Sequence, residues 1–228
     1  MKDMKILMIS DVHGNYEALK KVIELEDYSM IYCMGDIVDY GPSPQECVDL
    51  IRKEADIVVR GNHDNAVAFG VDCGCGYELK DLSQEVRGIT IEDLDEESLE
   101  YLGRLPIEAV TEDHFITHAS KGDMFKYLKP NTEENEFKEF NGVEQDLVFL
   151  GHTHIQMDRE VDGKRFVNPG SLGQPRDGDN RAAYAVIEDG DIRFERMSYD
   201  IETVMEKMVE KDYPERAINI LREGRIVY

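Results

Sequence analysis

The sequence contains no tryptophan, only four cysteines and few basic residues, and its apolar runs are short. Four cysteines in 228 residues do not provide the dense disulfide framework of small secreted domains. No apolar run approaches the roughly 20 residues that a membrane-spanning helix needs. Lys and Arg number 26 against 49 Asp and Glu, which disfavours tight binding to nucleic acid or anionic lipid. We therefore expect no nucleic acid as a tight partner and no membrane association.

The remaining composition favours a globular protein with one large domain, spanning residues 1–228. Hydrophobic residues make up 41% of the chain, enough to build a core. The apolar stretch near the N-terminus runs directly into Asp11 and His13, so we expect no signal peptide and a cytoplasmic protein. The formal net charge of -23 repels anionic substrates unless a strong positive charge, such as bound metal, lies in the site.

The cysteines by themselves indicate little about function. Cys33 and Cys47 fall in an expected strand and an expected helix, where buried free thiols are common. Cys73-Gly-Cys75 is too short for an ordinary zinc pair and has no second pair behind it. A redox or metal role is thus not the favoured interpretation, and the sequence assigns no role to Cys73 and Cys75.

The pattern of apolar residues predicts an α/β fold. Compact apolar runs predict strands at 5–10, 30–34 and 56–60, with a helix capped by Asn15 and another at 44–54 between them. This βαβαβ order is typical of a parallel sheet with helices outside it. Further strands are expected at 107–110, 114–117 and 147–150, followed by two hairpins that turn at Asp162-Gly163 and Asp189-Gly190.

Two segments depart from this alternation. Residues 66–106 are acidic and rich in helix formers, and we expect a helical lid insertion that covers the site. The C-terminal tail, 200–228, is expected to be helical. It carries an apolar stripe at helical spacing, formed by Ile201, Val204, Met205, Met208 and Val209. The stripe fits packing on the body of the protein and also a homodimer, so the oligomeric state stays open.

Polar clusters stand at the ends of the expected strands. They are Asp11-Val12-His13, Gly35-Asp36-Ile37-Val38-Asp39, Gly61-Asn62-His63-Asp64, the single His118, and Gly151-His152-Thr153-His154. Ligand sites of open α/β sheets lie beyond the carboxyl ends of the strands, so we expect these groups to meet there. Glycine precedes three clusters, where a sharp turn or a close backbone approach to a ligand is needed. Alternation along an extended segment would point the first two side chains, Asp11 and His13, at one ion.

In this order the clusters resemble the motifs of the calcineurin-like metallophosphoesterases. The continuation Asn168-Pro169-Gly170-Ser171 is similar to the small prokaryotic phosphodiesterase branch. Asp11-Val12-His13-Gly14-Asn15 is similar to the diadenosine tetraphosphatase and protein-phosphatase branches. The resemblance implies two stacked mixed β-sheets flanked by helices, a four-layer αββα sandwich.

The resemblance also implies a role for each motif residue. The first metal would be bound by Asp11, His13 and His154, the second by Asn62, His118 and His152, with Asp36 bridging both. His63 would be the general acid or a clamp on the substrate, and Asp39 would orient its ring. The implied cofactors are two divalent transition-metal ions, manganese first, with iron, nickel, cobalt or zinc as alternatives.

Residues around the motifs allow more than one interpretation. Arg176 is a candidate phosphate contact, together with Asn62 and His63, but it can equally pair with a surface carboxylate. We expect Asp64 to cap the helix that follows it. His114 lies outside every motif, and we expect it to be structural.

These residue types suit the hydrolysis of phosphate esters. Two divalent ions bring about four positive charges against two carboxylates, so by simple addition the site keeps about two and attracts phosphate. Two ions can share a water and lower its pKa for attack on phosphorus. A histidine with a near-neutral pKa can then protonate the leaving alkoxide.

We therefore expect a dinuclear metal-dependent phosphoesterase that hydrolyses a small phosphodiester or phosphomonoester by attack of a metal-bridging hydroxide. In protein phosphatases of the superfamily an arginine follows the aspartate equivalent to Asp39, whereas Tyr40 stands here, which disfavours a protein substrate. A protein serine/threonine phosphatase and a dinucleoside polyphosphate hydrolase remain alternatives. A protein-interaction scaffold on the same fold, as in the retromer subunit, is the non-enzyme alternative, although His63 and every metal ligand are retained here.

Overall fold

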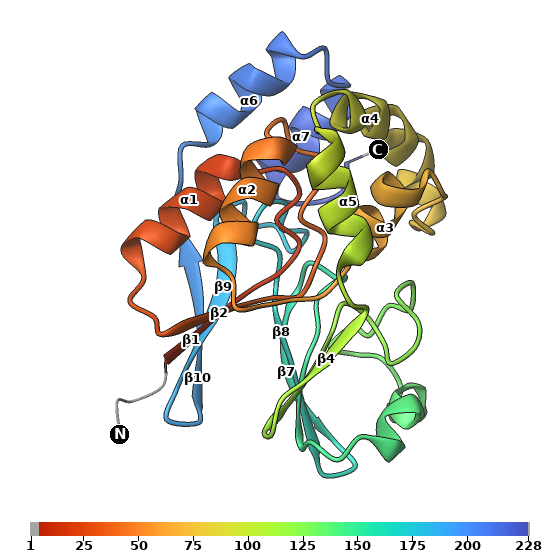
Figure 1. Cartoon of the computed structure of the whole chain (residues 1–228), viewed down its shortest axis with the longest axis vertical. Helices are drawn as coiled ribbons and strands as arrows, with labels where there is room; N and C mark the ends of the chain where they lie inside the picture. The colour runs from red at the N-terminus through yellow and green to blue at the C-terminus, as the bar shows by residue number, and fades with distance from the viewer. Residues whose placement is uncertain (1–4, 228) are drawn as a thin grey trace.

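The computed structural model describes residues 5–227, apart from the side chain of Tyr77, and contains two packed five-stranded sheets (Figure 1). The ends of the expected domain, 1–4 and 228, lie outside the described residues. The first sheet has the order β10-β9-β1-β2-β3. Its strands are β1 (Lys5–Ile9), β2 (Met30–Cys33), β3 (Ile57–Val58), β9 (Ala182–Glu188) and β10 (Asp191–Met197).

The second sheet has the order β4-β5-β6-β8-β7. Its strands are β4 (Glu108–Val110), β5 (His114–Thr117), β6 (Leu147–Phe149), β7 (Gln156–Val161) and β8 (Lys164–Pro169). Both sheets are mixed: β1, β2 and β3 run parallel, as do β5, β6 and β8, whereas β9, β10, β4 and β7 pair antiparallel. The parallel order expected from the N-terminal part is therefore correct for β1, β2 and β3.

The first strand shows why the strands are continuous apolar runs. Ile6 and Met8 face the second sheet and pack in a core with Phe149. Leu7 and Ile9 point the opposite way, into the core beneath the helices. Side chains alternate along a strand, so a strand buried on both faces has no polar position.

Helices α1 (Tyr16–Leu25) and α2 (Pro44–Glu54) cover the outer face of the first sheet (Figure 1). Asn15 caps α1 as expected, because its side chain accepts a hydrogen bond of 3.1 Å from the Ala18 N–H. The outer face of the second sheet is covered by η2 (Glu134–Gly142), a 3-10 helix whose Phe137 packs on Phe166. The expected four-layer arrangement is confirmed, with a 3-10 helix in the outermost layer.

The two hairpin turns are also confirmed. Asp162 and Gly163 link β7 to β8, and Asp189 and Gly190 link β9 to β10. All four have positive φ, the conformation that a two-residue hairpin turn requires.

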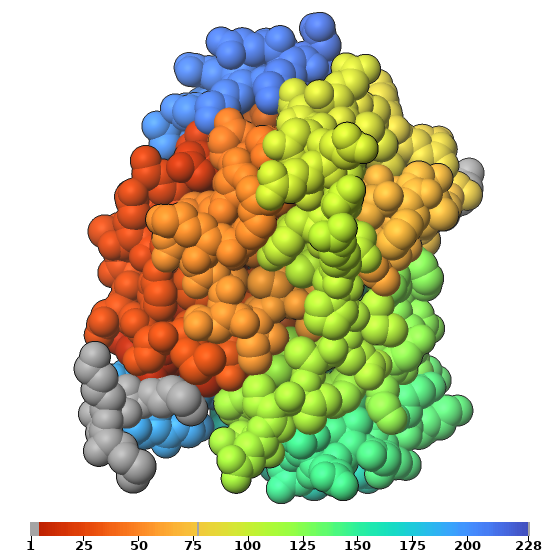
Figure 2. All heavy atoms as spheres, in the orientation of Figure 1, coloured from red at the N-terminus to blue at the C-terminus, as the bar shows by residue number. Residues whose placement is uncertain are grey.

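The expected helical segment, 66–106, is helical, although its first helix starts earlier than predicted. Its helices are α3 (Asn62–Phe69), the 3-10 helix η1 (Tyr77–Leu79), α4 (Lys80–Glu92) and α5 (Glu96–Arg104). The tail forms α6 (Ile201–Glu210) and α7 (Glu215–Glu223). Figure 2 shows the yellow segment beside the blue tail helices at the top of the molecule. None of the helices within residues 5–227 has the length and apolar character to cross a membrane.

The tail stripe packs within the chain, with one exception. Val204, Met205 and Met208 are buried against Leu82 of α4. The prediction was wrong for Val209, which is 63% exposed. The packing joins the tail to the 66–106 segment. The lid role of that segment stays a prediction.

Candidate metal centre

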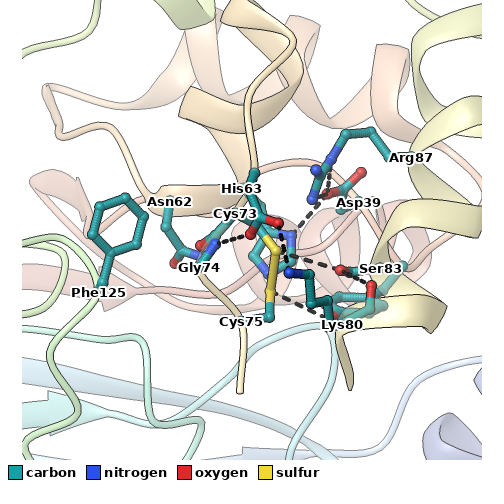
Figure 3. The surroundings of a disulfide bond; sticks show 12 residues. Asp39, Asn62, His63, Cys73, Gly74, Cys75, Lys80, Ser83, Arg87 and Phe125 are labelled. Carbon is teal, nitrogen blue, oxygen red and sulfur yellow. Dashed lines mark hydrogen bonds and ion pairs between the residues drawn. A yellow bond between two sulfur atoms is a disulfide. The ribbon is translucent and has the colours of Figure 1, made fainter. Parts of the chain in front are cut away.

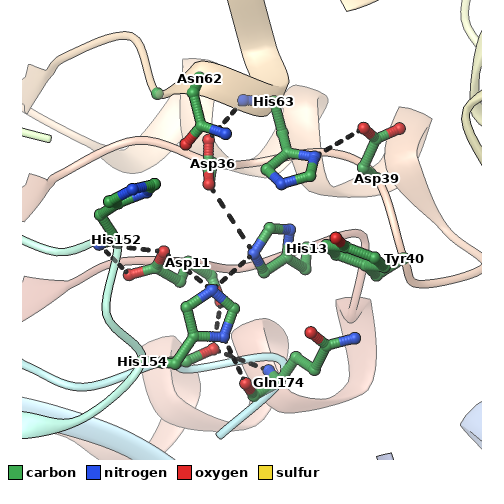
Figure 4. Close-up of polar contacts among 12 residues, drawn as sticks. Asp11, His13, Asp36, Asp39, Tyr40, Asn62, His63, His152, His154 and Gln174 are labelled. Atoms are coloured by element: carbon green, nitrogen blue, oxygen red, sulfur yellow. Dashed lines mark hydrogen bonds and ion pairs between the residues drawn. The ribbon is translucent and has the colours of Figure 1, made fainter. Parts of the chain in front are cut away.

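The seven residues expected to bind metal lie together and are buried. Figure 4 labels all of them except His118. They form two groups whose ligand atoms lie within 4.8 Å of one another, Asp11 with His13 and His154, and Asp36 with His118 and His152. Asn62 joins the second group, because its Oδ1 lies 3.0 Å from His118 Nε2. Asp36 lies between the groups, with Oδ2 3.2 Å from His118 Nε2 and 3.8 Å from His13 Nε2. The structure brings together the residues that the resemblance assigns to each metal, and their binding of metal stays a prediction.

The backbone that carries these ligands is left-handed rather than extended. The φ angles are 52° at Asp11, 46° at His13, 54° at Asp36, 66° at His152 and 59° at His154. The expected alternation along an extended segment was therefore wrong as a reason for the pairing of Asp11 with His13. The loop that carries Asp11 and His13 is hydrogen-bonded to the loop that carries Asp36, because the His13 N–H donates to the Asp36 carbonyl at 2.9 Å. Such conformations cost free energy and persist where surrounding contacts impose them, as at functional sites.

Glycine precedes the clusters because neighbouring loops touch there. A Cβ at Gly61 would lie 2.1 Å from Asp36 Oδ1, and one at Gly151 would lie 1.9 Å from Ser10 Oγ. Gly35 has a φ of +85°, and a Cβ there would lie 2.5 Å from the backbone nitrogen of Gly61. The three glycines therefore leave room for a neighbouring loop, whereas the sequence analysis expected a sharp turn or a close approach to a ligand.

Gly35→Ala is expected to destabilise the protein and to weaken metal binding. A left-handed alanine costs about 1–2 kcal/mol, and the contact with the Gly61 backbone adds to that cost and displaces Asp36. The matched control is Gly163→Ala, at φ +79° with no heavy atom within 4 Å of the added Cβ. Urea unfolding and elemental analysis would compare the variants. Equal effects in both would show that loop contact at Gly35 does not matter.

Backbone carbonyls orient all four ligand imidazoles. The Nδ1 atoms of His13, His118 and His154 lie 3.0, 2.6 and 2.5 Å from the carbonyl oxygens of Val38, Met34 and Gln174. His152 is reversed, with Nε2 3.2 Å from the Phe125 carbonyl. A carbonyl accepts a hydrogen bond from N–H, so a proton stands on the outer nitrogen of each ring. The inner nitrogen then turns a lone pair inward wherever the ring is neutral.

The inward lone pairs fit a cation. His13 Nε2 and His154 Nε2 lie 3.1 Å apart, and neither carries a proton to share when Nδ1 donates to a carbonyl. Asp11 Oδ1 lies 3.3 Å from the same His154 nitrogen. Two lone pairs and a carboxylate turned toward one point repel one another unless a positive charge lies among them. Imidazole and carboxylate together suit a divalent transition metal.

The protonation of the site agrees with this assignment. Burial lowers the pKa of His13 well below its ordinary value, and burial with the His118 charge lowers the pKa of His152 to about 3. Burial also opposes charge on His118, but the Asp36 carboxylate outweighs it and raises the His118 pKa to about 9. The His118 proton thus supplies positive charge beside Asp36, where a bound cation would supply it instead.

His63 lies beside the candidate metal ligands without belonging to either group (Figure 4). Its Nδ1 is 2.7 Å from Asp39 Oδ2, which is the contact expected for an orienting carboxylate. His63 stands in the first turn of α3, which begins at Asn62. The ring is directed by the helix and lies with its centroid 5.1 Å from that of His13.

Sequence reasoning missed Arg87. Its Nε and Nη2 both donate to Asp39 Oδ2 at 3.2 Å, so Asp39 holds His63 and is itself held by a buried guanidinium. A signal was present, since Arg87 occupies the buried stripe of α4 with Ser83 and Thr90. A charged residue on such a stripe indicates a buried ion pair.

Asp64 has a wider role than the expected helix cap. It lies inside the first turn of α3. Its carboxylate accepts a hydrogen bond of 3.0 Å from the N–H of Gly61, the N-cap residue of the helix. It also accepts from the N–H groups of Asp36 and Ile37, each at 2.8 Å. Asp64 therefore ties α3 to the loop that carries the proposed bridging ligand. The His114 ring packs on those of Tyr32 and Phe149, which is the environment expected of a structural residue.

A cavity of about 330 Å³ adjoins the centre. Tyr127, Thr153 and Arg176 are among its lining residues, and the Tyr127 ring lies 4.0 Å from that of His152. The Arg176 guanidinium lies 5.7 Å from the centre of the Tyr40 ring, and Nη2 donates to Gln174 Oε1 at 2.9 Å. Within residues 5–227 the buried Nε of Arg176 has no hydrogen-bond partner.

The two sheets and the buried cluster of imidazoles, carboxylates and one amide at their strand ends define a metal-dependent hydrolase. The chain belongs to the calcineurin-like phosphoesterase superfamily, whose domain model matches residues 4–190. It is accordingly a hydrolase that acts on phosphoester bonds.

Relatives cover nearly the whole chain. An uncharacterised protein of Methanocaldococcus jannaschii is 34% identical over 92% of this chain and 94% of its own length. The phosphodiesterase YfcE of Escherichia coli is 25% identical over 81% of this chain and 88% of its own. A solved metallophosphoesterase of Sphaerobacter thermophilus is 32% identical with a TM-score of 0.85, covering 98% of this chain and 100% of that one. The expected superfamily and fold are confirmed.

Proposed function

We propose that the protein is a dinuclear metal-dependent phosphoesterase that hydrolyses a small phosphodiester or phosphomonoester. The observation that carries the proposal is the pair of inward-facing ligand groups joined through Asp36. His13 Nε2 and His154 Nε2 lie 3.1 Å apart in the first group, and Asp36 Oδ2 lies 3.2 Å from His118 Nε2 in the second. Manganese is the first candidate, with iron, nickel, cobalt and zinc as alternatives.

The chain's own residues supply the rest of the chemistry. Two divalent ions bound to these groups would lower the pKa of a water and neutralise charge on the phosphate. Asp39 accepts from His63 Nδ1, which leaves Nε2 to hold the proton for the leaving oxygen. Arg87 fixes Asp39 in turn, so the orientation of the His63 ring does not depend on the substrate.

Arg176 would contact the phosphate in place of the arginine that protein phosphatases carry after the equivalent of Asp39. Tyr40 stands at that position and is buried, with its ring 4.9 Å from those of His13 and His63. Arg176 lies over the same Tyr40 ring and brings a guanidinium to this side of the centre. Its unpartnered Nε, within the described part of the chain, is a donor suited to a phosphate oxygen.

The cavity beside the centre supports a small substrate. Its volume of about 330 Å³ is at the lower end of ordinary ligand pockets. Lys129 and Arg176 line it together with the apolar Leu79 and Ile155, so it offers room for an organic group next to an anion. The relative from Escherichia coli is named a phosphodiesterase, which favours a diester.

The test is hydrolysis of mono- and bis-p-nitrophenyl phosphate by metal-stripped protein, with and without manganese. We expect turnover only when metal is restored, because the proposed nucleophile is a water whose pKa the two metal ions would lower. The ratio of the two rates distinguishes a monoesterase from a diesterase. Absence of turnover with any of the candidate metals would favour the protein-interaction scaffold.

A further inference from the structure

The Cys73-Gly-Cys75 pair forms a disulfide in the structure, which the sequence did not predict (Figure 3). The other two cysteines, Cys33 and Cys47, are free and buried in the core. The disulfide stands in the loop between α3 and η1, and this loop lies against the catalytic histidine of the proposed mechanism. Its position raises the question of what it does to His63.

Both cysteines of this loop touch the site. Cys75 Sγ lies 3.1 Å from His63 Nε2, the nitrogen that is turned away from Asp39. The Cys73 carbonyl accepts a hydrogen bond of 2.8 Å from Asn62 Nδ2, which turns Asn62 Oδ1 toward His118. The disulfide therefore links the group next to the proposed acid to the group that orients a proposed ligand.

We propose that Cys73 and Cys75 form a reversible redox gate, which blocks access to His63 Nε2 when the cysteines are oxidised and exposes it when they are reduced. This inference rests on the proposed role of His63. A general acid must come within about 2.6–3.2 Å of the leaving oxygen. Cys75 Sγ already stands at that distance from Nε2, so the leaving oxygen cannot approach while the sulfur is held there.

The loop is built so that Cys75 can move once it is released. Cys75 is half-buried. The next residue is Gly76, and a Cβ added there would have no heavy atom within 4 Å, so there is space around the chain at this point. Cys73 is buried and is held through its carbonyl by Asn62. Reduction would therefore free the Cys75 side chain to turn toward solvent and leave the Cys73 backbone in place.

The chemistry is an ordinary thiol–disulfide exchange. Two molecules of a small thiol reduce the Cys73–Cys75 bond: each thiol loses its proton and one electron, the two join as a new disulfide, and both cysteines become thiols. A thiol oxidant of the diamide type accepts two electrons and two protons in the reverse direction. A reducing cytoplasm would keep the site open, and oxidative conditions would close it.

The experiment uses the full chain, oxidised with diamide or reduced with a phosphine, desalted and loaded with manganese. Alkylation followed by mass spectrometry verifies the state of Cys73 and Cys75. We expect the reduced protein to hydrolyse a phenyl phosphodiester at least about ten times faster, because protonation of this leaving group is worth roughly 10²–10⁴-fold. Diethyl pyrocarbonate should label His63 in the reduced protein and not in the oxidised one, a readout that needs no turnover.

Matched variants distinguish the gate from a general effect of oxidation. Cys75→Ala should be as active as the reduced parent in both states and should label at His63 in both. Cys47→Ala, which changes a buried free thiol, should keep the full response to oxidation. If no ester is hydrolysed in either state but labelling still follows reduction, the proposed function fails and the redox gate stands.

Three results would overturn the gate. One is equal hydrolysis and equal His63 labelling in the two verified states. The second is alkylation of both cysteines after diamide treatment, which would mean that no disulfide forms. The third concerns the ligand atoms of His63, Cys73 and Cys75, which lie within 4.8 Å of one another. If the reduced protein retained a zinc ion there, and His63 were no more reactive than before, the trio would be a metal site instead.

Discussion

Asp36→Asn is expected to lose metal from both groups and, with it, the hydrolysis of phosphate esters. The Asp36 carboxylate lies against His118 of one group and His13 of the other, and asparagine keeps its shape while removing its charge. Breaking a buried charge pair costs about 3–5 kcal/mol. That cost corresponds to a loss of roughly 10²–10³-fold or more in metal affinity. Elemental analysis after dialysis, followed by a rate measurement at fixed manganese, checks both consequences.

The matched control for this substitution is Asp158→Asn. Asp158 is a surface carboxylate paired with Arg165, and its loss should leave metal content and rate unchanged. The amide in Asp36→Asn can still accept from the His63 N–H, so an unfolding curve close to that of the parent is expected. Two equivalents of metal retained by Asp36→Asn would disprove the bridging role.

His63→Gln is expected to lower kcat on a phenyl phosphodiester by about 10²–10⁴-fold with metal content unchanged. Metal is retained because His63 belongs to neither ligand group. The loss should be smaller on nitrophenyl esters, since nitrophenolate departs with little need of a proton. Steady-state rates on the two esters, measured on reduced protein, give this comparison.

The two esters also separate the two roles that the sequence leaves open for His63. Equal losses on both would show that His63 clamps the substrate and does not protonate the leaving oxygen. His114→Gln is the control, because His114 packs on Tyr32 and Phe149 in the core between the sheets. It should alter stability and leave the ratio of the two rates as in the parent.

Much of the fold could be predicted from local patterns. The helix at Pro44–Glu54 and the strand at His114–Thr117 were placed at their observed limits. Both follow from periodicity, with a helix-starting proline in one and a short apolar run in the other. The hairpin turn at Asp162 likewise depends on two adjacent residues that tolerate positive φ. Strand β3 was predicted too long because the chain turns into α3 at Asn62, and no local pattern marks that turn.

The convergence of the seven candidate metal ligands was also predictable, but its physical reason was not. Side chains at the ends of parallel strands meet at one edge of a sheet, which is a property of the topology. The direction of each side chain depends instead on the left-handed backbone at Asp11 and His13, imposed by hydrogen bonds to the loop that carries Asp36. Those bonds join segments far apart in the chain and leave no local signal.

The sequence by itself determined the superfamily, the order of the elements and the seven residues that meet at the centre. Each of these depends on residue type and spacing along the chain. The tertiary structure alone decided that Arg87 holds Asp39, that Arg176 lies over Tyr40, and that Cys75 touches His63. Such contacts depend on where two distant segments pack, because the free energy of a buried charge or sulfur is set by its neighbours in space.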